Sequence, residues 1–265
     1  TFTGAAGRAD PDRPTAGNPS TIGEGTTQAP DRQPPAVSST DLDDAVSRAI
    51  LAHYAGGGTR GEFRTESHAT LRTVEDGDKV IVYLMAFYAE YDFPGGVPEL
   101  VSGSHVPTSL TFAKDEKGTY SLKEYWEASD GSEYLSSIRK KFPADIAQLT
   151  NTQRHADRLR EACDEKARAY LRDRMSEEEL VQAIIGSPQE ASNPYAYIER
   201  HRDEYDTLVS RGPTALRYIY GRFLAGGQDG LEGWIMLAAL RDLLGDEAKP
   251  AENGSSPQTL FDEYA

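Results

Sequence analysis

Two ionisable side chains in the first half of the chain stand where they could act as an acid and a base. Glu66 and His68 are separated by one residue in a segment typical of a β-strand, so both side chains point to the same face. Glu62 and Arg64 continue that face. The pattern leaves two interpretations open. The first is an acid–base site. The second is the solvated outer face of a sheet, with ion pairs between the charged side chains, and the alternation of charged residues favours this second interpretation.

No other spacing in the sequence is typical of catalysis or of metal binding. The five histidines are dispersed and lack the spacing of a zinc-binding helix, and there is one cysteine, Cys163. The glycines at residues 56–58 precede a predicted strand rather than follow one, which is the wrong order for a phosphate-binding loop. We therefore expect no metal, no cofactor and no catalytic residue other than Glu66 and His68.

The sequence predicts an antiparallel sheet preceded by a helix. Alternating apolar and polar residues predict four strands, at residues 64–73, 80–91, 106–114 and 120–127. The second strand is apolar on both faces, so it should be central and covered on both sides. A helix with one apolar stripe begins near Thr40. This order predicts an α+β domain whose curved four-stranded sheet wraps over the helix, as in cystatin-like or nuclear-transport-factor-like folds.

A sheet with so few reactive groups indicates a recognition surface. Residues 92–106, between the second and third strands, are rich in glycine and proline, and we expect a loop at the rim of any ligand cleft. On the last strand, Trp126 is predicted to share a face with Leu122. The ligand-binding residues predicted from this arrangement are Tyr88, Ser104, His105 and Trp126.

Composition and helical periodicity divide the chain into five parts. Residues 1–40 hold six prolines and five glycines, which predicts a disordered stalk. Residues 41–150 form the sheet domain, and residues 151–175 form one charged helix that we interpret as a connector. Residues 176–247 form an all-helical module, and residues 248–265 return to the composition of a disordered tail.

The helical module carries clear start signals. Ser176 and Glu179 have the spacing of a capping box, and Asn193-Pro194 is typical of the first residues of a helix. Two strongly amphipathic helices end the module at Gly245 and resemble a single HEAT-type pair.

The charge of the chain argues against two classes of partner. The net charge is −15 at pH 7, from 28 basic and 43 acidic residues. Neither folded part offers the basic surface that nucleic acid or an anionic membrane requires. No apolar run approaches the roughly 20 residues needed to cross a bilayer. We expect contact with a membrane only through an N-terminal anchor that is missing from this sequence.

Four short motifs lie in the predicted sheet domain. They are Val101-Ser102-Gly103-Ser104, Leu110-Thr111-Phe112, Leu122-Lys123-Glu124-Tyr125-Trp126-Glu127 and Asp130-Gly131-Ser132. With these motifs the chain resembles, over roughly residues 40–175, a family of uncharacterised extracytoplasmic domains of Gram-positive bacteria. Those domains occur at the C-terminal end of antirepressor membrane metallopeptidases of the β-lactam-sensor type and in anchored envelope proteins. The segment beginning at Asn193-Pro194-Tyr195 resembles a second module from the same settings.

The resemblance implies a setting rather than a reaction. The peptidase portion, with its His-Glu-x-x-His helix, is absent here. The motifs that are present carry no assigned chemistry, so no catalytic residue is carried over. The resemblance implies an extracytoplasmic location with the chain tethered to the membrane through its stalk; a cytoplasmic location is the alternative.

Three functions are consistent with these patterns. The first is a non-enzymatic sensory or binding module of a bacterial cell-envelope protein, whose α+β part binds a ligand and whose helical part contacts a partner protein. The second is a small hydrolase or isomerase that uses Glu66 and His68 in a pocket of the sheet. The third is a structural spacer, which predicts no pocket.

Overall fold

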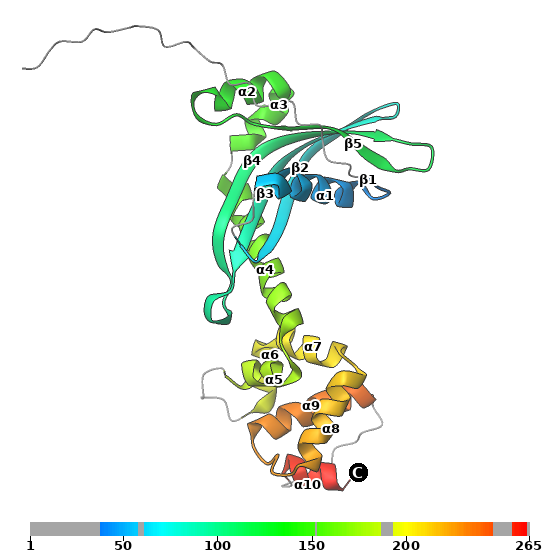
Figure 1. Cartoon of the computed structure of the whole chain (residues 1–265), viewed down its shortest axis with the longest axis vertical. Helices are drawn as coiled ribbons and strands as arrows, with labels where there is room; N and C mark the ends of the chain where they lie inside the picture. Colours follow the sequence, from blue (N-terminus) through cyan, green and yellow to red (C-terminus); the bar gives the residue numbers. More distant parts are fainter. Residues whose placement is uncertain (1–37, 58–60, 152, 187–192, 246–255, 264–265) are drawn as a thin grey trace, which may run out of the picture. The chain divides into compact units, whose positions relative to one another are not determined.

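The fold is α+β: a helix, a curled antiparallel sheet that forms half a barrel, and an all-helical C-terminal region (Figure 1). The computed structural model describes residues 38–57, 61–151, 153–186, 193–245 and 256–263. All of these residues belong to one compact unit, Pro34–Ala265. The predicted stalk, residues 1–40, lies outside the described residues except for its last three.

The sheet has five strands among the described residues, one more than predicted. Their order is β1-β5-β4-β3-β2, with every neighbouring pair antiparallel. The bounds are β1 Ser38–Ser39, β2 Phe63–Asp76, β3 Lys79–Asp92, β4 Glu99–Lys114 and β5 Tyr120–Glu127. The four predicted strands are confirmed. The fifth, β1, consists of two serines with no pattern of their own, and it exists because it pairs with β5.

Strand β4 begins earlier than predicted. The loop expected over residues 92–106 is confined to the residues before Glu99, because the pairing with β3 continues to Tyr91 opposite Leu100 and Asp92 opposite Glu99. Ser104 and His105 therefore lie within a strand and not at the rim of a loop. Their polar composition disfavours a strand, but pairing with the strongly β-forming β3 overrides that preference.

Helix α1 (Leu42–Tyr54) covers one face of the sheet and lies within its curl (Figure 1). The helix starts one residue later than predicted, since Asp41 rather than Thr40 caps it by accepting a hydrogen bond from the Asp44 amide at 2.8 Å. Its apolar stripe is fully buried against the inward-facing residues of β3 and β4. The side chains that form this inner core include Val46, Ala49, Ile50, Val82, Leu84, Leu110 and Phe112.

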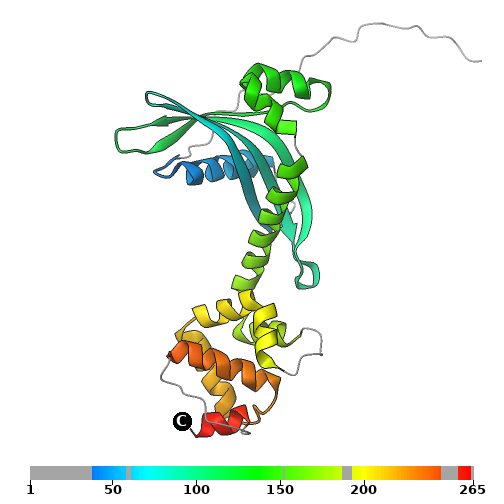
Figure 2. The same cartoon turned by 180° about the vertical axis from the view of Figure 1, so that it is seen from behind.

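Helix α4 (Gln153–Arg174) packs on the opposite face of the same sheet, as Figure 2 shows. Leu159, Cys163 and Ala167 are buried against the outward-facing residues of β2 and β3, which include Met85, Phe87 and Tyr91. The interpretation of this helix as a connector is therefore incomplete: it forms the outer layer of the sheet domain. The prediction that the second strand is covered on both sides is confirmed, because α1 and α4 cover alternate side chains of β3.

A small helical segment between β5 and α4 closes one end of the outer face. It consists of a 3-10 turn, Gly131–Glu133, then α2 (Tyr134–Lys141), α3 (Ala144–Ala147) and a second 3-10 turn, Gln148–Asn151. Ile138, Phe142 and Ile146 pack together against Trp126 and Tyr83 of the sheet. This outer cluster holds α2 and α3 on the sheet.

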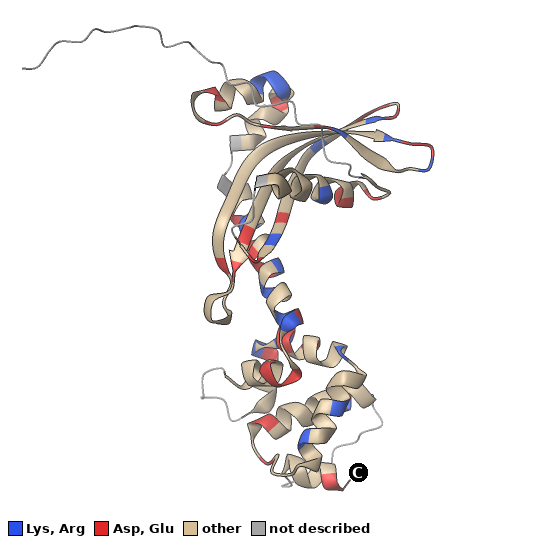
Figure 3. Ribbon diagram, viewed as in Figure 1, with Lys and Arg blue, Asp and Glu red and all other residues tan. Residues whose placement is uncertain are grey.

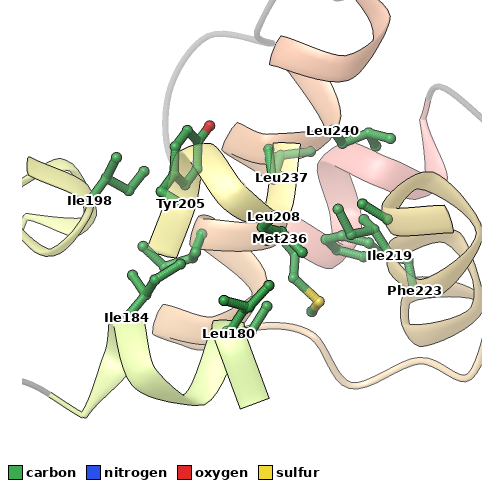
Figure 4. Close-up of a cluster of buried hydrophobic side chains, with 14 of the residues drawn as sticks. Leu180, Ile184, Ile198, Tyr205, Leu208, Ile219, Phe223, Met236, Leu237 and Leu240 are labelled. Atoms are coloured by element: carbon green, nitrogen blue, oxygen red, sulfur yellow. The ribbon is translucent and has the colours of Figure 1, made fainter. Parts of the chain in front are cut away.

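The C-terminal helices form one core around α9. They are α5 (Glu177–Ile185), α6 (Pro194–Arg200), α7 (Arg202–Ser210), α8 (Pro213–Leu224), α9 (Leu231–Leu244) and α10 (Pro257–Asp262). Helix α9 contacts each of the other five among the described residues, and Met236, Leu237 and Leu240 of α9 lie in the shared core (Figure 4). The predicted pair, α8 and α9, is therefore part of a larger cluster rather than a separate two-helix unit.

Both start signals of the helical region are confirmed, and the predicted tail needs correction. Ser176 and Glu179 form the capping box, and Asn193 caps α6. Helix α10 lies within the residues interpreted as a disordered tail. Its Phe261 is buried and stacks on Phe223 of α8 with 4.7 Å between ring centroids. Six residues are too few to show a helical period, so only the packing against α8 and α9 reveals this element.

Two glycines of the helical core should respond in opposite ways to the same substitution. A Cβ atom on Gly233 would clash with the Gln228 carbonyl and approach the Pro257 side chain at 3.1 Å, whereas a Cβ atom on Gly221 meets nothing within 4 Å. We expect Gly233→Ala to lower the free energy of unfolding by about 1–3 kcal/mol through overpacking. Gly221→Ala should raise it by about 0.5–1 kcal/mol through helix propensity.

Urea denaturation of both variants checks this pair. Equal effects of the two substitutions would mean that α9 and α10 are not packed as closely as described.

Candidate functional site

The predicted acid–base pair lies on the inner face of the sheet, beneath the first turn of α1. On strand β2, His68 Nδ1 lies 3.0 Å from Glu66 Oε2, and its Nε2 lies 3.0 Å from Asp43 Oδ1. The side chains of Glu66 and His68 are 3% and 8% exposed. The pair is therefore not on a solvated outer face of the sheet. It is also not open to a substrate in this structure, because α1 covers it, and neither interpretation of the sequence included this burial.

A lysine from the opposite layer completes this network. Strand β2 is an edge of the sheet, so Lys166 of α4 reaches around it. The Lys166 ammonium donates a hydrogen bond to the Glu66 carbonyl at 2.6 Å and lies 3.7 Å from Glu66 Oε1. Asp43, His68, Glu66 and Lys166 thus link α1, β2 and α4 by alternating negative and positive charges.

The charges of this network stabilise one another. Burial by itself lowers the pKa of His68, but the hydrogen bond and charge of Glu66, together with those of Asp43, outweigh it, so the pKa is raised. Burial likewise acts to raise the pKa of Glu66, but the hydrogen bond and charge of His68 outweigh it, so that pKa is lowered. The protonated imidazole donates both N–H groups to carboxylates and has no lone pair left to accept a proton. This geometry favours an ion-pair clasp over a general base.

Two of the four predicted ligand residues meet near the C-terminal end of α1. The Tyr54 hydroxyl lies 3.0 Å from Glu127 Oε2 and 3.1 Å from Ser104 Oγ. A single hydroxyl proton allows Tyr54 to donate to the carboxylate and to accept from the serine. The Tyr54 ring stacks on Tyr88 with 4.4 Å between centroids, and the Tyr88 hydroxyl donates to Glu90 at 2.6 Å.

His53 extends this aromatic and acidic group. Its ring stacks on Tyr125 at 3.8 Å, and its Nε2 lies 3.4 Å from Glu127 Oε2. Burial acts to raise the pKa of Glu127, but the hydrogen bond and charge of His53 and the hydrogen bond of Tyr54 outweigh it, so the pKa is lowered. This group of side chains was not predicted from the sequence. Tyr125 and Glu127 are two residues apart on one strand, which was the available signal, but nothing local indicates that the end of α1 meets them.

The other two predicted ligand residues lie on the opposite face of the sheet. His105 pairs with Phe87, which faces α4, and Trp126 packs on Phe142 with 5.7 Å between ring centroids. The prediction that Trp126 shares a face with Leu122 is wrong because β5 carries a bulge. Thr111 pairs with Glu124, whereas the next residue pairs with Leu122, so the faces reverse between Leu122 and Trp126. Tyr88, Ser104, His105 and Trp126 therefore cannot converge on one ligand.

His105 faces α4 without a partner for one ring nitrogen. Its Nε2 is buried and has no hydrogen-bond partner among the described residues. Burial lowers the pKa of His105, and the nearby His155 of α4 lowers it further. A neutral ring between the sheet and α4 fits a packing role.

A surface hollow lies on the helical segment between β5 and α4. It has a volume of about 620 Å³, and its walls come from α2, α3 and the 3-10 turn that follows. The lining residues are Leu135, Ile138, Arg139, Ala144, Ala147, Gln148 and Thr150. Hollows of about 300–1,000 Å³ with mostly apolar walls and few polar groups are typical of small-molecule sites.

Arg139 is the one charged group in this lining. In the part of the chain that the structure describes, no carboxylate pairs with it. Two acidic side chains beside this helical segment pair with other residues: Asp145 lies 2.5 Å from the Arg72 guanidinium, and Glu124 lies 2.5 Å from the Lys141 ammonium. The hollow therefore combines four apolar and two neutral polar side chains with the exposed Arg139 guanidinium, which has no carboxylate partner among the described residues.

Comparisons of the chain with protein families, with curated proteins and with solved structures return no match. Among the described residues, no three His, Cys, Asp or Glu side chains are grouped so that they could hold a metal ion. Within the same residues, every helix is too short or too polar to cross a membrane.

Proposed function

We propose that this chain is a non-enzymatic binding or sensory module whose ligand occupies the hollow of α2 and α3. The observation that carries the proposal is a hollow of small-molecule size whose lining includes the exposed Arg139 guanidinium, for which the described residues offer no carboxylate partner. On the inner face of the sheet the described charged side chains bond to partners: Glu127 to Tyr54, and His68 to both Glu66 and Asp43. The Tyr125 hydroxyl there is buried without a hydrogen-bond partner among the described residues, but it carries no charge.

The small hydrolase or isomerase is the less favoured function. A helix within a curled antiparallel sheet supports the analogy with cystatin-like and nuclear-transport-factor-like folds, but a fold by itself does not imply an activity. Here the candidate acid and base, Glu66 and His68, are 3% and 8% exposed and are held in ion pairs. Catalysis would require opening the clasp between α1 and β2. A structural spacer is also less favoured, because it leaves the hollow and its charge without a role.

The proposed setting is the outside of a bacterial cell membrane, in an anchored cell-envelope protein that signals through a partner. The support is the motif resemblance over roughly residues 40–175. Protease digestion of intact cells and of lysed cells checks the location. An extracytoplasmic domain is digested in both samples, whereas protection in intact cells would contradict the proposed setting.

The binding function is tested by a screen that does not depend on any assumed ligand. We expect at least one compound among cell-wall fragments and small metabolites to raise the melting temperature, because a ligand at 100 times its Kd adds about 2.7 kcal/mol to the free energy of unfolding. Hydrogen exchange with the bound compound should show protection in α2 and α3. Turnover of any compound that is lost in His68→Gln would instead support the hydrolase, and the absence of any hit would support the spacer.

A further inference from the structure

We propose that the hollow of α2 and α3 binds a small amphiphilic monocarboxylate, with the carboxylate on Arg139 and the apolar chain along the walls. This assignment rests on the proposed function and names the ligand class for that site. It follows from the shape of the hollow, from its charge and from the cluster that supports it.

The shape of the hollow suits a short apolar chain. Leu135, Ile138 and Arg139 are spaced at i, i+3 and i+4 on α2 and therefore lie on one side of that helix. The other wall is lined by Ala144 and Ala147 of α3, whose side chains end at Cβ and leave the space between the helices open. Leu135 is 53% exposed although it is a large apolar residue. Covering it with an alkyl chain would remove apolar surface from water.

The charge of the hollow selects an anion with a flat, two-oxygen head. Arg139 contributes the only charge in the lining, and it is positive. A guanidinium donates two parallel hydrogen bonds to a carboxylate, and the amide of Gln148 can donate a further one. The chain as a whole has a net charge of −15, so the positive charge of this lining is opposite in sign to the net charge of the chain. One charge also indicates a ligand with one anionic group.

The same features argue against a membrane surface as the occupant. The basic residues in the last turn of α2 are Arg139, Lys140 and Lys141 (Figure 3), and Lys141 is paired with Glu124. Adsorption to anionic lipid requires clusters of about 4–8 basic residues. Arg139 and Lys140, which have no carboxylate partner among the described residues, fall short of that number. A discrete ligand that enters the hollow needs only the one guanidinium.

Trp126 contacts the apolar cluster that holds α2 and α3 on the sheet. Ile138 lines the hollow and is also buried in the cluster with Phe142 and Ile146, which packs on Trp126. Trp126 is therefore a positioning residue for α2 and α3 rather than a ligand contact.

Decanoate below its micellar concentration is the probe for this site, with binding measured by isothermal titration calorimetry on the intact chain. We expect Arg139→Gln to weaken decanoate binding about ten-fold or more, as removal of charge-assisted hydrogen bonds does. The matched control is Lys140→Gln, which removes the same charge from the adjacent exposed residue outside the lining. Arg139 and Lys140 are both exposed, so the two variants differ only in whether the lost charge lines the hollow. Lys140→Gln should change the affinity less than about three-fold, because its charge lies outside the lining.

Two further measurements separate the contribution of the ligand's carboxylate from that of its alkyl chain. Decanol keeps the alkyl chain and lacks the carboxylate, so its weaker binding should not change in Arg139→Gln. Ala144→Leu fills the hollow with a side chain at an exposed position, so it should weaken decanoate and decanol alike while leaving the melting temperature within a few degrees.

Three results would overturn the assignment. The first is that the wild-type protein does not bind decanoate. The second is that Arg139→Gln and Lys140→Gln lower the decanoate affinity equally. The third is that the protein binds phosphatidylglycerol vesicles and that each variant weakens vesicle binding as much as decanoate binding. The first result leaves the proposed binding function standing if the unbiased screen finds another ligand. A screen without hits would end both proposals, so the two failures are distinguishable.

Discussion

We expect Ala167→Asp in α4 to lower the free energy of unfolding by about 3–5 kcal/mol, the cost of an uncompensated buried charge. Ala167 is 0% exposed and packs with Met85 and Ala89 against the outer face of the sheet. A carboxylate there would lose its water and gain no partner in that apolar cluster. Urea denaturation followed by circular dichroism measures the change. A loss of this size requires α4 to be an integral layer of the sheet domain.

The control is the same substitution one and a half turns away on the same helix. Ala162 is exposed, so Ala162→Asp shares the lower helix propensity of aspartate, roughly 0.7 kcal/mol, and lacks the burial. We expect the free energy of unfolding to fall by less than about 1 kcal/mol in this variant. If α4 were only a connector, the two variants would have similar stability.

The second large effect concerns the clasp between α1 and β2. We expect His68→Gln to lower the free energy of unfolding by about 3 kcal/mol at pH 6, the low end of the range for removing one partner of a buried ion pair. The low end applies because Lys166 remains 3.7 Å from Glu66 Oε1. Denaturation of the wild-type and variant chains across pH 4–9 measures the difference.

The pH dependence of that difference follows from the two pKa shifts. The pKa of His68 is raised above 6.5 in the folded state, so its contribution is fully present below pH 6.5 and is lost as pH rises through the folded pKa. The pKa of Glu66 is lowered below 4.5, so its contribution is present above pH 4.5 and is lost as pH falls through the folded pKa. The wild-type advantage over His68→Gln should therefore be greatest between about pH 5 and 6.5.

His105 changes the free energy of unfolding with pH in the opposite direction to His68, so its contribution must be separated from that of the clasp. Its folded pKa is lowered by burial and by His155, so its contribution is present above pH 6.5 and is lost as pH falls. Comparing His68→Gln with the wild type cancels this term, because His105 is present in both chains. The variant His105→Gln should show a difference from the wild type that changes with pH in the opposite sense. A difference between His68→Gln and wild type that is constant from pH 5 to 9 would contradict the clasp.

The features of this protein that depend on residues close together in the sequence could be predicted from the sequence. The apolar residues on both faces of residues 80–91 predicted a central strand, and the structure confirms it as β3, with α1 on one side and α4 on the other. The capping box of Ser176 and Glu179 was readable because its two hydrogen bonds span three residues. The shared face of Glu66 and His68 could also be predicted, because side chains two residues apart on any strand point to the same side.

The sequence by itself determined the order and kind of the main helices and strands, since hydrophobic periodicity and capping are local physical properties. Only the tertiary structure decided which of their faces meet. A bulge opposite Thr111 and Phe112 moved Trp126 to the outer face, pairing drew Ser104 into a strand, and packing on Phe223 made a helix of Pro257–Asp262. The hollow beside Arg139 likewise needs two helices at a fixed separation. These features arise from contacts between segments distant in the chain, and no local pattern encodes such contacts.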